Sequence, residues 1–155
     1  MGSSKTFAQE QFETQYDIQY KVGSDGQTSV QQNISIINKQ KDVLATTYVL
    51  TVKQMEIYDV SAEDRKGTIE TDVKTSSNET TVRVTLRNQA IGLGKQNDIS
   101  LFYKSKQIAS KIGEIWNINI PPVEASDSTS KYNVSLTIPH EFGPKIYISP
   151  NVGST

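Results

Sequence analysis

Residues 12–22 alternate without interruption between two kinds of side chain, and this alternation limits the fold more than any other feature of the sequence. One set of alternate positions consists of Phe12, Thr14, Tyr16, Ile18, Tyr20 and Val22, and the set between them consists of Glu13, Gln15, Asp17, Gln19 and Lys21. Successive side chains of a β-strand point to opposite faces, so a period of two indicates a strand with one buried face. Residues 23–26 contain the glycines and the aspartate that hairpin turns prefer. A returning strand then repeats the alternation with Thr28, Val30, Gln32, Ile34 and Ile36 on one face, so the sequence predicts an opening antiparallel hairpin.

Shorter segments rich in β-branched and aromatic residues predict the remaining strands. These segments are residues 45–52, 55–62, 68–74, 80–88, 97–105, 116–120 and 131–139. In the second of them we expect Met55, Ile57 and, after a change of face, Val60 to point inward. The fourth alternates Val82, Val84 and Leu86 with Arg83, Thr85 and Arg87. The charged residues 63–67 and the polar residues 75–79 are expected to form turns.

Helical signals are nearly absent from the chain. Residues 105–115 are the best candidate for a short helix, although Gly113 interrupts them. Strands joined by hairpin turns without helical crossovers predict an all-β fold, an antiparallel two-sheet β-sandwich of about nine strands with at most one short helix.

The domain organisation is expected to be simple. A chain of 155 residues suits one domain with its own core. We expect residues 1–9 to be an artificial or disordered N-terminal tail, residues 10–150 to form a single β-sandwich domain, and residues 151–155 to be a C-terminal tail. The Ser-rich, acidic segment 121–131 is expected to be a long mobile loop. The two ends read as cut from a longer protein.

Composition narrows the classes of function. Sixteen basic and seventeen acidic residues give a formal net charge of -1, and the basic residues do not cluster, so we expect no nucleic-acid partner. The chain has no cysteine, which rules out thiol nucleophiles, disulfides and cysteine metal sites. No apolar run approaches the roughly 20 residues that span a bilayer.

Trp116, the only tryptophan, stands in an alternating segment that ends at Pro121 and Pro122. Trp116, Ile118 and Ile120 fall on one face of this predicted strand, and Asn117 and Asn119 fall on the other. We interpret Trp116 as a core residue, because an alternating strand buries one face. The alternative is an exposed platform for a sugar ring.

No motif predicts catalysis. His140 is the only histidine, and it lies beside Glu141 near a turn, where an exposed position is expected. The glycines of residues 91–95 lack the spacing of a phosphate-binding loop, so we interpret them as a turn or bulge. The acidic residues Asp59, Glu63, Asp64, Glu70 and Asp72 lie among basic ones, as in a solvated turn. We therefore predict no catalytic, cofactor-binding or metal-binding residues, no cofactor and no enzymatic activity in this chain.

Two further chemical features stay open at this point. Calcium could bind the acidic residues of segment 59–72, although the ligand spacing of an EF-hand is missing. A lysine–asparagine isopeptide crosslink is open to a chain without cysteine, and it would lower the intact mass by about one ammonia.

Three segments resemble a known family. They are "YDIQYKVGSDGQTSVQQNISIIN", "IGLGKQNDISLFYKSKQIASKIGEIWNINIP" and "YNVSLTIPHEFGPKIYISP". Together they resemble the N-terminal β-sandwich of bacterial transglutaminase-like surface proteins, over most of residues 10–150. More distantly, the layout is similar to the all-β N-terminal domain of zinc aminopeptidases. In the transglutaminase-like family, the resemblance implies, a following domain with a Cys-His-Asp triad performs the chemistry.

The expected function is therefore supportive. The resemblance implies an extracytoplasmic location and a non-catalytic accessory role in a larger transglutaminase-like protein, where this module would bind a neighbouring domain or another protein. The alternative is an adhesion module for glycan or protein, which the seven tyrosines and the Ser-rich loop favour. Several tyrosines in a row on a solvent-facing sheet would favour the alternative, and burial of all of them would count against it.

Overall fold

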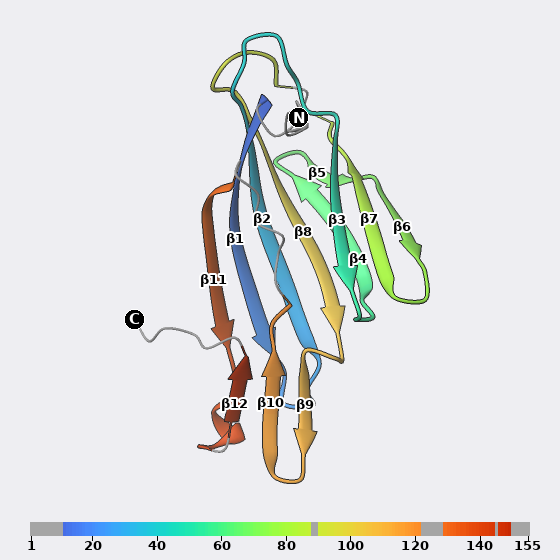
Figure 1. Cartoon of the computed structure of the whole chain (residues 1–155), viewed down its shortest axis with the longest axis vertical. Helices are drawn as coiled ribbons and strands as arrows, with labels where there is room; N and C mark the ends of the chain where they lie inside the picture. Colours follow the sequence, from blue (N-terminus) through green and yellow to red (C-terminus); the bar gives the residue numbers. More distant parts are fainter. Residues whose placement is uncertain (1–10, 88–89, 122–128, 145, 150–155) are drawn as a thin grey trace, which may run out of the picture.

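The computed structural model describes residues 11–87, 90–121, 129–144 and 146–149, and the regular secondary structure of this part of the chain is almost entirely β-strand (Figure 1). Its strands are β1 (Phe12–Val22), β2 (Thr28–Asn38), β3 (Thr47–Lys53), β4 (Tyr58–Asp64), β5 (Gly67–Ile69), β6 (Thr71–Thr75), β7 (Glu79–Thr85), β8 (Gln96–Ser105), β9 (Ala109–Ile112), β10 (Ile115–Asn119), β11 (Thr129–Thr137) and β12 (Ile146–Ser149). A turn of 3₁₀-helix, η1 (His140–Phe142), precedes β12. Within these residues no helix is long and apolar enough to cross a membrane.

Some predictions fall outside the described residues. They are the tails 1–9 and 151–155 and residues 122–128 of the predicted loop. The end of that loop prediction was wrong, because β11 already begins at Thr129.

The described strands form two layers (Figure 1). One layer is a six-stranded sheet in the order β11-β1-β2-β8-β4-β5, and the other consists of two three-stranded sheets, β3-β7-β6 and β12-β10-β9. The buried side chains of the large sheet lie on one face, where Tyr20 pairs with Val30 and Val30 pairs with Tyr103. All three sheets contribute to one cluster of buried apolar residues. The all-β sandwich predicted from the sequence is confirmed.

The opening hairpin is also confirmed. β1 and β2 pair antiparallel over their whole length, with Val22 opposite Thr28 at the turn. The turn is closed by the N–H of Gly23, which donates to the carbonyl of Gln27 at 2.8 Å. The inner positions of β2 are buried as predicted, including the amide side chain of Gln32.

Two strand pairs are parallel, which the prediction of antiparallel sheets did not include. β1 pairs parallel with β11, and β10 pairs parallel with β12. Parallel neighbours cannot be joined by a tight hairpin and need a long connection. β1 and β11 lie at opposite ends of the described chain, and β10 and β12 are separated by the whole of β11, so the intervening chain is long enough.

The segment predicted as one strand over residues 68–74 is split between the layers. β5 pairs with β4 in the six-stranded sheet, whereas β6 pairs with β7 in a small sheet. The chain therefore changes layer at Glu70, as strands do at the corners of sandwiches. This split, β9 in the segment predicted as a helix, and β12, which was not predicted, account for the three described strands beyond the nine predicted.

The predicted change of face in residues 55–62 is confirmed. The register of β4 against β8 shifts between Tyr58 and Ser61, and Asp59 has a positive φ of 52°. Such a bulge inserts an extra residue and reverses the faces that follow it. Met55, Ile57 and Val60 are partly buried against the core.

The helix predicted over residues 105–115 was wrong. This segment forms the hairpin of β9 and β10, in which Ile112 pairs with Ile115 across a two-residue turn. Gly113 opens the turn with a φ of 63°, as the first turn residue of a type II′ hairpin does. Pairing with β10 and burial of Ala109 override the weak helical propensity.

Candidate functional site

The residues that could have carried chemistry lie apart. His140 and Glu141 are both exposed in η1. Within the described residues, no group of three or more His, Asp and Glu side chains could hold a metal ion. The five acidic residues of the predicted solvated turn are spread over β4, β6 and the residue between β5 and β6. One of them, Asp59, has a carboxylate oxygen 3.6 Å from the Lys104 ammonium, and both side chains are largely exposed.

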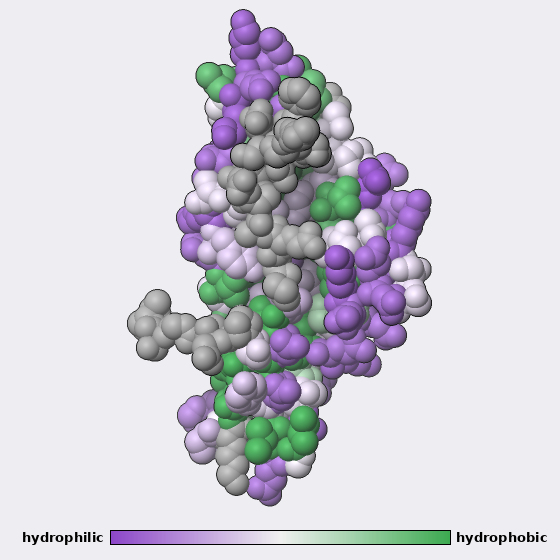
Figure 2. All heavy atoms as spheres, in the orientation of Figure 1, coloured by the Kyte–Doolittle hydropathy of each residue, from purple (hydrophilic) through white to green (hydrophobic). Residues whose placement is uncertain are grey.

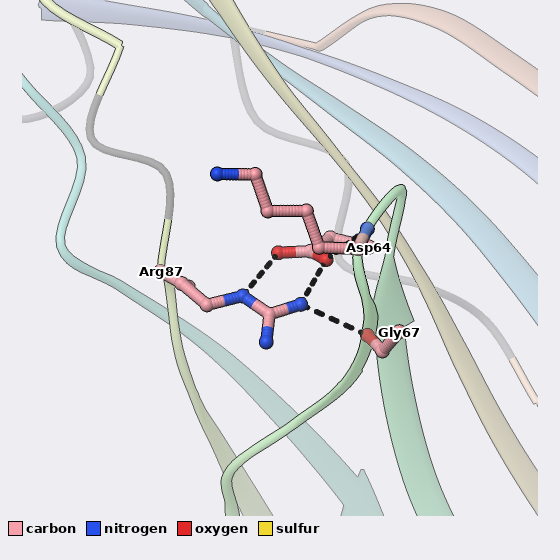
Figure 3. Close-up of polar contacts among 4 residues, drawn as sticks. Asp64, Gly67 and Arg87 are labelled. Atoms are coloured by element: carbon pink, nitrogen blue, oxygen red, sulfur yellow. Dashed lines mark hydrogen bonds and ion pairs between the residues drawn. The ribbon is translucent and has the colours of Figure 1, made fainter.

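Another of the acidic residues, Asp64, joins the two layers (Figure 3). Its side chain is 6% exposed, and its carboxylate accepts hydrogen bonds from Nε of Arg87 at 3.3 Å and from Nη2 of the same side chain. Nη2 of Arg87 also donates to the carbonyl of Gly67 at 3.3 Å, and the N–H of Lys66 donates to Asp64 at 2.8 Å. The Arg87 hydrogen bonds hold the pKa of Asp64 below its usual value, although burial opposes them. Because Asp64 ends β4 and Arg87 follows β7, we call this contact the interlayer clasp.

Residues 91–95 form a turn, as predicted. Gly92 and Gly94 have positive φ angles of 119° and 78°. The side-chain amide of Asn38, at the end of β2, donates to the carbonyls of Val43, Ala90 and Gly92. The turn is thus held by a buried side chain and has a structural explanation.

Trp116 is a half-buried core residue, as predicted. Its ring stacks on Phe142, with 4.0 Å between the centroids and 3° between the planes. Ile118 and Ile120 on the same face are buried, and Asn119 on the other face is exposed. Gly26 packs so closely that a β-carbon there would lie 3.1 Å from the indole ring. Phe142 covers one face of the ring, Gly26 lies against its edge, and the Lys111 ammonium lies 6.0 Å from its centroid, so Trp116 does not present an open platform to a sugar.

A cleft of about 360 Å³ lies between β3 and the buried face of the six-stranded sheet. Its lining consists of residues 49–54 together with Tyr16, Tyr20, Gln32, Tyr48, Tyr103 and Pro121. We call it the tyrosine cleft, because four of the seven tyrosines of the chain line it. It lies beside one edge of the β3-β7-β6 sheet, and it reaches Pro121, which comes shortly after β10 of the other small sheet.

The polar atoms of the tyrosine cleft are incompletely paired. The Tyr48 hydroxyl donates to that of Tyr16 at 3.5 Å, and Nε2 of Gln32 donates to the Tyr103 hydroxyl at 3.4 Å. The Tyr20 hydroxyl and Oε1 of Gln32 have no hydrogen-bond partner in the described part of the chain, although both residues are only 1% exposed. The Tyr103 hydroxyl lies near enough to that of Tyr20 to help raise the Tyr20 pKa, but no hydrogen bond of normal geometry joins the two. Leaving such buried atoms unpaired costs about 1–3 kcal/mol each, so they favour an added partner.

Burial also makes these phenols hard to ionise. It raises the pKa of Tyr103 to about 12, although the hydrogen bond from Gln32 opposes the effect. It also raises the pKa of Tyr20 and of Tyr48 well above the ordinary value of tyrosine, and neighbouring tyrosines add to both shifts. At neutral pH these phenols are uncharged, and the charged residue of the lining is Lys53, which is exposed at the end of β3.

One feature of the sequence indicates this cleft, although the cleft was not predicted. Gln32 was placed on the inner face of its strand between Val30 and Ile34, where an amide is unusual. Tyr16 and Tyr20 fall on one face of the first predicted strand, together with Ile18 and Val22. An amide and several phenols on facing inner positions indicate a polar interior site.

The outward face of the β12-β10-β9 sheet carries three exposed large apolar side chains. Ile112 and Ile115 are paired across β9 and β10 and are 67% and 49% exposed, and Tyr147 on β12 is 64% exposed. Hydrophobic residues gather at this lower end of the molecule in Figure 2. We call Ile112, Ile115 and Tyr147 the apolar face.

The outer face of the six-stranded sheet is polar around Phe102. A shallow hollow of about 330 Å³ is lined there by the partly buried Phe102 together with Gln19, Lys21, Ser29, Gln31 and Lys104. Tyrosines do not form a row on this face. The most exposed ones, Tyr132 and Tyr147, lie in different sheets. The tyrosines are therefore neither lined up on one solvent-facing sheet nor all buried, and their exposure does not decide the adhesion alternative.

Comparison with known proteins does not assign this chain to a family. No family model matches the chain, and no curated protein matches it. Among solved structures, 46 chains match. One is a variant of the M1 zinc metallopeptidase of Deinococcus radiodurans bound to a Tyr-Ser-Ala substrate, with 16% identity and a TM-score of 0.43 over 66% of this chain and 22% of that chain. The match names a zinc peptidase, as the more distant sequence resemblance does, but likeness of this degree carries no argument about function.

Proposed function

We propose that this chain is a non-catalytic β-sandwich module that docks on a neighbouring domain of a larger protein through the apolar face. The observation that carries the proposal is the exposure of three large side chains, Ile112, Ile115 and Tyr147, on one small sheet. Exposed apolar clusters of this kind mark sites of contact with other proteins. Burying them against a neighbour would remove their apolar surface from water, which contributes about 25 cal/mol per Å².

The proposed location of the module, and its place within a larger protein, are supported by its sequence. The resemblance to transglutaminase-like surface proteins supports an extracytoplasmic parent whose catalytic domain lies outside this chain. The near-neutral charge supports a protein partner over nucleic acid. Finding the next domain of the full reading frame would test this setting directly.

The experiment compares this chain alone with the longer protein by hydrogen–deuterium exchange. We expect residues 110–117 and 146–149 to gain protection in the longer protein. Replacement of Ile112, Ile115 and Tyr147 by serine should weaken binding of the separately produced neighbouring domain by at least about tenfold, which corresponds to 1.4 kcal/mol. Ile91 and Leu93 are similarly exposed in the turn of residues 91–95, so their replacement by serine is the matched control. Unchanged exchange in both segments would refute the proposal.

The adhesion alternative has one observation in its favour, the hollow around Phe102 on the polar sheet face. An aromatic ring flanked by amides and lysines suits stacking and hydrogen bonding to a sugar. Glycan-array binding that is lost in Phe102→Ala and retained in Tyr147→Ser would favour this alternative. Absence of binding to any glycan would remove it.

A further inference from the structure

A second site is suggested by the free edge of β3, independently of the apolar face. β3 is the outermost strand of the β3-β7-β6 sheet. The N–H of Leu86 donates to the carbonyl of Thr46, and the N–H of Gln54 donates to that of Asn78, so the even-numbered residues of β3 bond to β7. In antiparallel pairing the residues between them direct their N–H and C=O groups the other way. Val49 and Thr51 therefore present backbone groups at this edge that no strand of the described residues pairs with.

The tyrosine cleft runs along this edge. Its lining includes six consecutive residues, 49–54, which in extended conformation span roughly 17 Å. A strand added beside β3 would place alternate side chains toward the six-stranded sheet. There it would meet the Tyr20 hydroxyl and Oε1 of Gln32, two buried atoms of the cleft lining that have no hydrogen-bond partner in the described part of the chain. One occupant with both an extended backbone and a hydrogen-bonding side chain would therefore pair with the edge and with the two buried atoms.

We propose that the tyrosine cleft binds an extended peptide segment of a partner protein, which adds as a fourth strand to the β3-β7-β6 sheet and inserts one neutral side chain, Ser, Thr, Asn or Gln, between Tyr20 and Gln32. Such a side chain donates to the Gln32 carbonyl and exchanges a hydrogen bond with the Tyr20 hydroxyl. A carboxylate or ammonium group would lose its hydration without an opposite charge in the depth of the cleft. Strand addition of this kind takes affinity from the backbone and specificity from the inserted side chains.

The first test uses synthetic nonapeptides of alternating threonine and valine, with lysine at both ends and glutamine, methionine or glutamate at the centre. We expect the glutamine peptide to protect the amides of Val49 and Thr51 from hydrogen exchange. In fluorescence anisotropy it should bind at least about tenfold more tightly than the other two, the discrimination expected for one buried hydrogen-bonded group. Equal affinity of the three peptides, or no protection at millimolar peptide, would overturn the proposal. Protection of Thr51 without any peptide would also overturn it, since the chain itself would then fill the edge.

The second test removes the edge by substitution. Thr51→Pro deletes an N–H that points away from the sheet, which edge strands tolerate, so the fold should persist while peptide binding is lost. The matched control is Val73→Pro on β6, the opposite edge of the same sheet, where the N–H of residue 73 also points away from β7. Gln32→Leu should keep the fold and abolish the preference for glutamine over methionine. Retained preference in Gln32→Leu would contradict the role of the unpaired carbonyl even if Thr51→Pro failed to fold.

Discussion

At the scale of single residues, contacts with the backbone of a turn can matter as much as the core itself. Gly26 ends the first hairpin turn with a φ of 87° and lies against the ring of Trp116. That ring in turn stacks on Phe142. One glycine therefore connects the opening hairpin with the β12-β10-β9 sheet.

Gly26→Ala tests this connection. The methyl group would meet Cζ3 of Trp116 at 3.1 Å, in addition to the strain of alanine at positive φ. We expect a loss of about 1–3 kcal/mol in the free energy of unfolding, measured by urea denaturation. Gly94→Ala is the control, because Gly94 has a φ of 78° and no atom within 4 Å of the added carbon. Equal losses in the two variants would show that contact with Trp116 has no energetic weight.

At the scale of elements, the interlayer clasp links the end of β4 to the residues that follow β7. Two hydrogen bonds from the Arg87 guanidinium to the Asp64 carboxylate fix both the distance and the relative orientation of the two groups. Arg87 thus contributes a defined geometry as well as a positive charge. The neighbouring β5 and β6 belong to different layers, so the clasp lies where the chain changes sheet.

Asp64→Asn should lower the denaturation midpoint at neutral pH, because it removes the charged acceptor of Arg87. The pKa of Asp64 is lower in the folded state than its ordinary value. Its contribution to stability is therefore full above that ordinary value, about 4, and is lost as the pH falls through the folded pKa. The gap between variant and parent should close in acid. Asp72→Asn, at an exposed carboxylate of β6, is the control, and an equal effect there would contradict the clasp.

At the scale of the whole molecule, one continuous core joins all three sheets. A substitution in the tyrosine cleft should therefore change the stability of the whole domain. Tyr20 and Tyr103 belong to this core and line the cleft at the same time. The stability of the domain should consequently depend on the protonation of its buried phenols.

Alkaline titration tests this dependence. Burial raises the pKa of Tyr103 to about 12, whereas the unfolded chain has an ordinary value near 10. The stabilising contribution is complete below pH 10 and is lost as the pH rises toward 12, by about 3 kcal/mol for this one group. Urea denaturation from pH 8 to 11.5 should show a shallower decline in Tyr103→Phe. Parallel declines in variant and parent would disprove the contribution of Tyr103.

The sequence by itself determined most of the strands, with their inner faces and turns, but not β9 or β12. The alternation of β1 and β2, the change of face near Asp59 and the core position of Trp116 all follow from side chains a few residues apart. The alternating period is a local property of the backbone, so it can be read without knowing which strands are neighbours.

Only the tertiary structure decided the parallel pairs, the split of residues 68–74 between layers, and the tyrosine cleft. Each depends on which distant segments meet, and the same alternation is compatible with many pairings. Gln32 illustrates the limit. Its inward position was predictable, but it becomes part of a binding cleft only because the β3-β7-β6 sheet ends at β3, above the phenols of β1 and β8.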